Sequence, residues 1–483
     1  MRTIDLVVIA AYLVGITWFG ARFRESQKSL KDYFLGGRKT PWWAIAFSIV
    51  SAETSTLTVI GTPALSFNGN FGFLQVVLGY LFARLVISFL FLPQYFRGEL
   101  FTAYELMQRR FGPRLRKLTA GTFLLLRALA EGVRVFAISI VIAIILGTGE
   151  IASIVLIVCL TLFYTFEGGM TAVIWTDVVQ MILYVGGAIV SLVVMLGLIP
   201  GGWPHVVDVA SQADKWRIFD FGFEWSARFF AQPYNFWAGL LGGCFLTTAS
   251  HGTEQLMVQR LLSARSQRES RLALMSSWAV IAFQFTLFLV IGVILFVYYR
   301  DTGLAVPHPN DRIYPQFVWK ELPVGVAGLV IAAILAAAMS NLSAALNSLA
   351  STTIMDFYKP LRSHHDESYY LRLARLATLA WGVVLLAIGV LARGVPSVLE
   401  AGLGIASILY GCLLGVFLLG VLNRKASENA AMAGMVAGLV VNLYVRFGTT
   451  IAWTWYVLIG TTVTIATALA VSAVIDGRET ARG

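Results

Sequence analysis

The stretch SAETSTLTVIGTP, residues 51–63, lies inside an apolar run from Trp42 to Phe67 that is long enough to cross a bilayer. Residues 51–58 of this stretch carry five hydroxyl side chains beside Glu53, and Gly61 and Pro63 weaken the helical hydrogen-bond ladder. Breaking a helix inside a bilayer frees carbonyls that need a partner. The pattern therefore predicts a functional interruption in a membrane helix.

The whole chain has the composition of an integral membrane protein. Of its 483 residues, 58% are hydrophobic and only 13% are charged, and its mean hydropathy is +0.76. The first apolar run lacks a cleavage site and is predicted to be a helix rather than a signal peptide. We expect an all-α fold with about thirteen membrane helices, near 4–23, 42–67, 71–92, 118–146, 151–166, 172–198, 236–260, 273–299, 325–357, 371–393, 396–421, 430–446 and 451–474.

The net charge of +10 is explained by membrane topology. With the N-terminus outside, 24 Lys and Arg side chains fall in inward loops and nine in outward ones. The positive-inside rule then predicts a multi-pass protein of the cell (inner) membrane with its C-terminus in the cytoplasm. The sequence has no basic patch with interleaved aromatic residues, so we expect no nucleic-acid partner. The expected surroundings are the lipid bilayer, and nothing in the sequence indicates an obligate protein partner.

A second predicted span is interrupted by TTASHGTEQ, residues 247–255, five spans after the first interruption. We expect His251 to be a hydrogen-bonded residue of this break rather than a proton relay. Broken helices at equivalent places predict an inverted five-plus-five repeat. The predicted organisation is an N-terminal helix and inward loop (1–41), a first repeat (42–198), an external loop (199–235), a second repeat (236–421), and C-terminal helices and tail (422–483).

The sequence contains no motif for ATP hydrolysis and no nucleophile, base and orienting group of an enzyme. Transport energy would then come from an ion gradient. A sodium ion is readily coordinated by uncharged oxygen ligands such as carbonyls and hydroxyls. A second cluster of such oxygens lies in AAAMSNLSAALNSLASTT, residues 336–353. There Ser340, Ser343 and Asn347 share a face with the Ala337 carbonyl, and Asn341 lies on its flank. The alternatives are hydroxyls bonded to their own helix and a small-residue packing face.

Ionisable residues also occur within the predicted spans. Arg127, Glu131 and Arg134 follow one another at intervals of four and three residues, so that they share a helix face and Glu131 can pair with either arginine. The remaining arginine would suit a solute carboxylate. The alternative is a structural ion-pair network that reaches Glu53 or Glu254.

Several motifs together resemble the sodium/solute symporter family, whose members include sodium-coupled sugar, proline, pantothenate and sialic acid transporters. The motifs are DYFLGGR (32–38), FTAYELMQRRFG (101–112), VIWTDVVQ (173–180), VQRLL (258–262) and LSAALNS (342–348). The resemblance implies a LeuT-like inverted-repeat core. It further implies a sodium-coupled symporter that imports a small polar solute, carboxylate-bearing or sugar-like, by alternating access. A proton-coupled symporter of the same fold and a solute sensor that does not transport remain alternatives.

The resemblance also implies where sodium would bind. The principal site would use carbonyls of Ser51 and Thr54 together with Ala337 and Ser340, and Asn341 stands where members often have a serine.

A second sodium would use Asp177 with Ser340 and Ser343, although Ala344 replaces a further serine of that pattern. Asp177 lies one turn into its helix, where a carboxylate can instead complement the helix N-terminus.

For the solute, the sialic acid branch of the family is similar around the first broken helix. This similarity implies contacts from Ser55 and Thr58, an outer gate at Phe73, an additional polar contact from Gln75, and a carboxylate-binding arginine at Arg127 or Arg134.

Overall fold

The computed structural model describes residues 2–22, 36–97, 100, 102–165, 170–362, 367–422 and 426–480. These residues form helices, and the β-structure among them is one isolated bridge between Thr40 and Ala264. The predicted all-α class is therefore confirmed. The helices are α1 (Thr3–Ala21), η2 (Gly36–Arg38), α3 (Trp42–Glu53), α4 (Thr56–Asn68), η3 (Phe71–Phe73), α5 (Leu74–Val86), η4 (Ile87–Phe91), α6 (Leu92–Tyr95), α7 (Ala103–Arg110), α8 (Pro113–Leu146), α9 (Glu150–Thr165), α10 (Met170–Leu198), α11 (Gly202–Gln212), α12 (Ala227–Ala231), α13 (Phe236–Gly252), α14 (Gln255–Leu262), α15 (Gln267–Thr302), η5 (Asn310–Arg312), α16 (Ile313–Glu321), α17 (Val326–Thr352), η6 (Thr353–Tyr358), α18 (Glu367–Leu391), α19 (Val398–Leu422), α20 (Glu428–Gly448), η7 (Trp453–Trp455) and α21 (Tyr456–Thr480).

Each predicted span overlaps a helix, but the count of thirteen is not confirmed. Among the described residues, nine helices are long and apolar enough to cross a membrane, or ten if the bent pair α3 and α4 is one span. The shortfall comes from helices whose apolar part is short. Helix α13 has only 17 residues before its break, and the apolar parts of α9 and α17 are limited to Glu150–Leu162 and Val326–Leu335.

Capping residues, rather than the ends of apolar runs, set several helix boundaries. Helix α15 begins at Gln267 because the Ser266 side chain accepts a hydrogen bond from the Glu269 backbone N–H at 3.2 Å. Helix α8 begins at Pro113, since proline suits a first helical turn. Both helices therefore start N-terminal to their predicted apolar limits.

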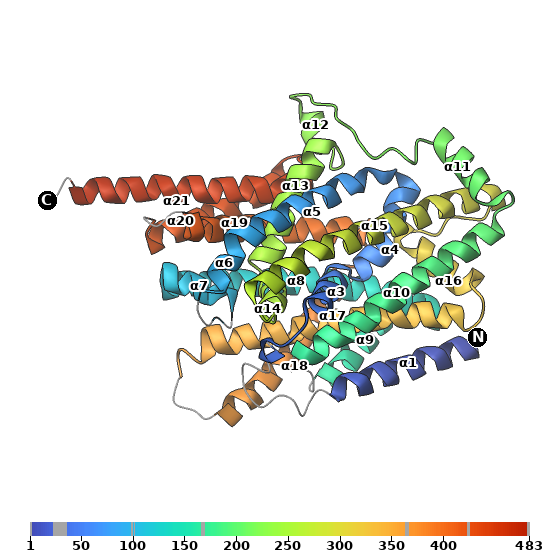
Figure 1. The fold of residues 1–483 in the computed structure, drawn as a ribbon, viewed down its shortest axis with the longest axis horizontal. Coiled ribbons are helices and arrows are strands. Elements are labelled where there is room, and N and C mark those ends of the chain that lie inside the picture. The colour runs from blue at the N-terminus through green and yellow to red at the C-terminus, as the bar shows by residue number, and fades with distance from the viewer. Residues whose placement is uncertain are drawn as a thin grey trace.

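The long helices run mostly along one axis of the molecule, and the N- and C-termini lie at opposite ends of that axis (Figure 1). Helices α5 and α13 pack side by side through glycines. A Cβ atom added at Gly243 would lie 2.1 Å from the Val76 carbonyl oxygen, and one added at Gly79 would lie 2.5 Å from the Leu240 carbonyl oxygen. The two backbones are therefore in direct contact, as small residues allow in membrane helices.

Asp311, in the 3₁₀ helix η5, fastens the N-terminal end of α19. Its Oδ2 atom accepts a hydrogen bond from the Val398 backbone N–H at 3.0 Å, and its side chain is buried. Oδ1 has no hydrogen-bond partner among the described residues. The pKa of Asp311 is raised to about 6, chiefly because burial disfavours the charged carboxylate; the hydrogen bond from the Val398 N–H lowers the pKa, and the nearby Glu400 carboxylate raises it.

The raised pKa of Asp311 predicts a pH-dependent stability. The folded protein binds this proton more tightly than the unfolded chain, where the ordinary pKa is 3.8. The protonated carboxyl therefore contributes its full stabilisation below pH 3.8, and this stabilisation is lost as the pH rises through about 6. In thermal unfolding of the detergent-solubilised protein, Asp311→Asn should become more stable relative to wild type across this window, by about 3 kcal/mol. A difference that does not change with pH would contradict the assignment.

Candidate transport site

The first predicted break is present, and it lies N-terminal to the residues expected to cause it. Thr54 and Ser55 have extended backbone conformations between α3 and α4, which meet at a bend of 63°. Helix α4 continues without interruption through Gly61 and Pro63. Gly61 instead allows close packing, because a Cβ atom there would lie 2.7 Å from the Leu399 Cβ.

The break leaves backbone carbonyls at the end of α3 and backbone N–H groups at the start of α4. Among the described residues, no backbone N–H donates to the carbonyls of residues 51–54, which end α3. The Thr54 hydroxyl accepts a hydrogen bond from Gln284 Nε2 at 2.5 Å, which holds the extended segment in place. The C-terminal end of α3 thus favours a cation, while the N-terminal end of α4 beside it favours an anion.

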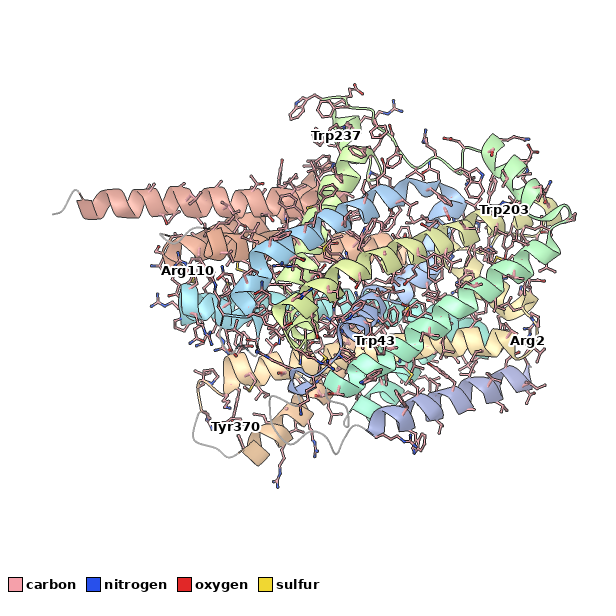
Figure 2. All side chains as sticks on the ribbon, viewed as in Figure 1. Arg2, Trp43, Arg110, Trp203, Trp237 and Tyr370 are labelled. Carbon is pink, nitrogen blue, oxygen red and sulfur yellow. The ribbon has the colours of Figure 1, made fainter. Side chains whose placement is uncertain are left out.

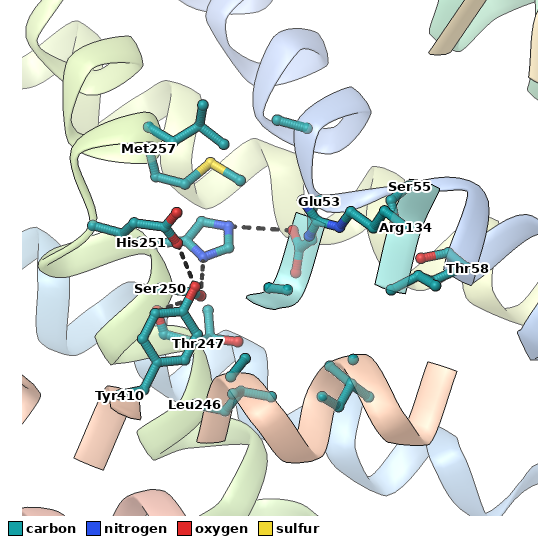
Figure 3. A pocket seen from close by; sticks show the side chains of 18 of the residues that line it. Glu53, Ser55, Thr58, Arg134, Leu246, Thr247, Ser250, His251, Met257 and Tyr410 are labelled. Atoms are coloured by element: carbon teal, nitrogen blue, oxygen red, sulfur yellow. Dashed lines mark hydrogen bonds and ion pairs between the residues drawn. The ribbon is translucent and has the colours of Figure 1, made fainter. Parts of the chain in front are cut away.

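The second break lies at Thr253 and Glu254, between α13 and α14. This position agrees with the predicted interruption at 247–255. Both breaks face one central cavity of about 110 Å³, which is lined by residues of α3, α4, α8, α13, α14 and α19. Figure 3 shows Glu53, His251 and Tyr410 around this cavity, with Ser55 and Thr58 on the side of α4.

The arginines of α8 also line the central cavity, and both are paired. Arg127 Nη1 lies 3.0 Å from Glu254 Oε1, and its Nη2 lies 3.6 Å from Glu131 Oε2. Arg134 Nη1 lies 3.1 Å from the same Glu131 oxygen. The Arg134 side chain is 21% exposed, against 4% for Arg127. Arg134 is therefore the more available cation, and Arg127 belongs to the network that reaches Glu254.

Glu53 pairs with Arg84 rather than with Arg127 or Arg134, the two arginines that the sequence analysis considered. Its Oε2 atom lies 2.6 Å from Arg84 Nη2, on α5, and 3.4 Å from His251 Nε2, on α13. His251 Nδ1 lies 2.8 Å from the Ser250 hydroxyl, which agrees with a hydrogen-bonded residue of the break. Arg84 was missed because its partner lies 31 residues away on another helix. The available signal was an arginine inside a span, which requires a nearby anion.

Tyr410 of α19 was also missed, since nothing in its apolar surroundings distinguishes it. Its hydroxyl donates a hydrogen bond to Glu254 Oε2. The tyrosine thereby ties α19 to the second break.

The second oxygen cluster lies on α17. Asn341 is buried and lines a cavity of about 10 Å³ together with Ser55, Thr56 and Arg134. This volume is about what one water molecule requires. Residues 337 and 340 belong to the same helix, but the side chains of Ala337 and Ser340 lie outside the part of the structure that is described.

Asp177 is held in an ion pair rather than at the N-terminus of its helix. Its Oδ2 atom lies 3.0 Å from Arg260 Nη2 of α14 and accepts a hydrogen bond from the Ser48 hydroxyl at 2.6 Å. Ser343 is half-buried on α17, and Ala344 lines an inner cavity of about 270 Å³ that also contains Arg260. Sodium coordination by Asp177 would therefore compete with Arg260.

Phe73, which the resemblance makes an outer gate, lies at the edge of the central cavity. Its ring packs against Phe285, with centroids 5.0 Å apart, and against Tyr234, with centroids 5.9 Å apart. It lines both the central cavity and an outer cavity of about 580 Å³. Leu256 of α14 similarly lines both the central and the inner cavity. Phe73 and Leu256 therefore each lie at a boundary between the central cavity and a neighbouring one.

Gln75 lies away from the central cavity and holds the external loop. Its Nε2 donates to the carbonyls of Gly72 and Tyr234, at 3.1 and 2.9 Å, and its Oε1 accepts from the Asp220 backbone N–H at 3.1 Å. These hydrogen bonds occupy both ends of the amide.

The Glu53–Arg84 pair predicts a non-additive effect on stability. Arg84→Met should cost about 3–5 kcal/mol, because it leaves a buried carboxylate without its cation. Adding Glu53→Gln should recover most of that loss. Thermal unfolding of the purified protein measures both effects. Arg217→Met is the matched control, since its ion pair with Asp214 is exposed and should contribute less than about 1 kcal/mol. If the double variant lost as much unfolding free energy as the sum of the losses of Arg84→Met and Glu53→Gln, the two side chains would not form a direct pair.

Comparisons with known proteins agree with this geometry. The chain matches the Sodium:solute symporter family over residues 33–438. It is 29% identical over 463 residues to the sodium/sialic acid symporter NanT of Aliivibrio fischeri, covering 95% of this chain and 91% of that protein. The sodium/sialic acid symporter SiaT of Proteus mirabilis is 28% identical over 471 residues, with 95% and 92% covered.

A solved structure extends the similarity to the whole fold. A Na⁺-coupled sialic acid symporter in its substrate-bound outward-open state superposes with a TM-score of 0.86 and 26% identity over 98% of each chain. The broken helices, the apolar spans and the long family match lead to one conclusion. This chain belongs to the sodium:solute symporter family, as a multi-pass, sodium-coupled transporter with a LeuT-like fold, and is not an enzyme.

Proposed function

We propose that this symporter imports a small polar organic solute, carboxylate-bearing or sugar-like, together with sodium. The observation that carries the proposal is the break between α3 and α4. Carbonyls without backbone partners and the free N-terminal end of a helix meet there, beside Arg134. A cation and an anionic group can therefore bind next to each other. The two sialic acid symporters among the relatives support a solute of this class.

Sodium would bind at the carbonyl end of this break. We assign the principal site to the carbonyls of Ser51 and Thr54, with Ala337, Ser340 and the amide oxygen of Asn341 from α17. The support is the position of Asn341 in the small cavity beside Ser55.

A second sodium would use Asp177 with Ser340 and Ser343. It requires the Asp177–Arg260 pair to open first, so it would form in another state of the transport cycle.

The solute would occupy the central cavity. We assign its contacts to Ser55, Thr58 and Phe73, with Arg134 as the first carboxylate partner and Arg127 as the second. Gln75 is left out of this set because its amide is used by the external loop.

Removing the Asn341 amide tests the sodium site. In proteoliposomes with an inward sodium gradient, Asn341→Ala should raise the sodium concentration for half-maximal uptake about tenfold, since a lost charged contact is worth about 1.5 kcal/mol. The matched control is Ser348→Ala on the same helix. The Ser348 hydroxyl donates to the Ala345 carbonyl at 2.9 Å, so its removal should leave the sodium concentration for half-maximal uptake unchanged. Unchanged sodium dependence in Asn341→Ala, or uptake driven by a pH gradient without sodium, would argue against the site.

We also propose an external N-terminus, a cytoplasmic C-terminus, and inverted repeats at 42–198 and 236–421. Two structural features support this arrangement. Arg2 and Trp203 lie at one end of the molecule and Arg110 at the other, as the charge count requires (Figure 2). Each proposed repeat begins with a broken helix, with breaks at 54–55 and 253–254.

Cysteine labelling tests this orientation. In a variant with Cys159, Cys244 and Cys412 replaced, a cysteine at the exposed position 211 should react with a membrane-impermeant maleimide on intact cells, and one at position 114 only after lysis. The opposite labelling pattern would reverse the proposed topology.

A further inference from the structure

The segment between α11 and α12 carries a row of aromatic side chains. Residues 219–225 read FDFGFEW and lie outside any helix. In an extended chain alternate side chains point to the same face, so the four aromatic residues share one face and the polar or small residues between them share the other. The rings of Phe219 and Phe221 agree with this register, because they stack with centroids 5.3 Å apart and planes 14° apart.

The aromatic row is largely exposed. Phe221 and Phe223 are each 62% exposed, and Trp225 is 82% exposed. Trp237, in the first turn of α13, extends the surface, since its ring contacts Phe223 with centroids 6.3 Å apart. We call Phe219, Phe221, Phe223, Trp225 and Trp237 the aromatic patch. A contiguous exposed apolar surface of this kind marks a contact with a protein or with a membrane.

The position of the aromatic patch favours a membrane. Leu241 lies one turn after Trp237 on the same face of α13 and is also exposed. Phe230 of α12 contacts Trp455, directly before α21, with centroids 5.3 Å apart. Figure 1 shows α12 and the chain that leads to it at the edge of the molecule, beyond α5. The patch is therefore continuous with the apolar surface that the membrane helices turn to lipid, at the level where α13 and α21 begin.

The residue types also suit the boundary between lipid tails and headgroups. Tryptophan is enriched at this level, where one side of the ring is apolar and the other is polar. Arg217 and Arg228 are exposed on either side of the aromatic row. Cations at this level attract the phosphates of anionic lipids. A lipid surface therefore accounts for both the aromatic residues and the flanking charges.

The segment that carries the aromatic patch is fastened beside Phe73, which we assign to the outer gate. Gln75 Oε1 accepts a hydrogen bond from the Asp220 N–H at 3.1 Å, and Gln75 Nε2 donates to the Tyr234 carbonyl at 2.9 Å. The Tyr234 ring packs against Phe73, and the Tyr234 hydroxyl donates to Glu400 of α19 at 2.7 Å. One amide thus holds both ends of the segment next to the gate.

From this geometry, we propose that the aromatic patch binds the outer-leaflet interface of the bilayer and thereby holds Tyr234 against Phe73. A lipid contact favours one state of a gate only if it is stronger in that state. The patch is level with the helix ends while Tyr234 covers Phe73, so the inserted patch stabilises a covered gate. The inference goes beyond the proposed function and takes from it only the external location of this segment and the gate role of Phe73.

A fluorescent label on the aromatic patch tests the lipid contact. In the variant with Cys159, Cys244 and Cys412 replaced, Trp225→Cys is labelled with an NBD group, and the protein is placed singly in nanodiscs that contain phosphatidylcholine and phosphatidylglycerol. Interfacial segments lie about 5–10 Å into the headgroup and acyl boundary, so a nitroxide on the lipid chain just below the headgroup should lower the fluorescence at least about twofold.

The matched control is Asp208→Cys, at an exposed polar position of α11. Its label should be quenched by aqueous iodide and not by the nitroxide lipid. If iodide quenches both labels alike and the nitroxide lipid quenches neither, the patch faces water, as expected of a surface that binds another protein, and the proposal fails. A label at position 225 that neither quencher reaches would place the patch inside the protein and would also overturn the proposal.

Removing the rings tests the link to the gate. Leu403→Cys lines the central cavity, so a membrane-impermeant thiosulfonate added outside has to pass Phe73 to reach it. In the same cysteine background, Phe221→Ser, Phe223→Ser and Trp225→Ser together should raise its reaction rate at least about twofold, because the covered state loses its lipid contact.

The control and a second variant separate this effect from a general loss of apolar surface. Leu304→Ser with Val324→Ser removes exposed apolar side chains elsewhere and should leave the reaction rate unchanged. Gln75→Met leaves the patch intact but breaks its fastening, so it should raise the rate and preserve nitroxide quenching at position 225. If neither the serine variant nor Gln75→Met raises the rate, the patch does not control the gate and the proposal is wrong. Neither readout needs sodium or solute, so this failure would leave the proposed symport untouched.

Discussion

A helix interrupted inside a bilayer must satisfy the backbone carbonyls that it frees, because no water is available there to do so. In this protein the carbonyls of residues 51–54 impose that requirement. Gln284 holds the extended segment through the Thr54 hydroxyl, and Asn341 adds a further polar group across the small cavity. A sodium ion is a suitable partner, since uncharged carbonyl and hydroxyl oxygens can coordinate it. If sodium binds there as we propose, ion binding and ordering of the break are one event, which would give a physical basis for coupling.

Buried charges then connect the two breaks to each other and to their surroundings. Glu53 ends α3 and contacts Arg84 on α5 and His251 on α13. Glu254 begins the segment after the second break and contacts Arg127 on α8 and Tyr410 on α19. Removing one partner from such a pair is costly in a medium of low dielectric constant. A movement of either broken helix must therefore carry its paired side chains along or exchange them for the charges of the ions and the solute.

Local sequence patterns predicted the features that depend on neighbouring residues. The all-α class and both helix breaks follow from composition and from polar clusters within apolar runs. The partners of Glu53 and Asp177 did not follow, because Arg84 and Arg260 lie on other helices and no local spacing specifies which helices meet. The count of thirteen spans was not confirmed, because a broken helix such as α13 is too short to qualify as a span by length and composition among the described residues.

The packing of α5 against α13 indicates how the two sides of the cavity can open separately. Their backbones touch at Gly79 and Gly243, which leaves no room for one helix to slide past the other. Phe73, the residue next to α5 that we assign as the outer gate, should therefore move with α13. Leu256, which lines both the central cavity and the cavity that contains Arg260, lies on α14 beyond the second break. The non-helical residues at 253–254 thus separate the body that carries Phe73 from the segment that carries Leu256. If these two side chains are the gates, a hinge at that position would allow one gate to open while the other stays closed.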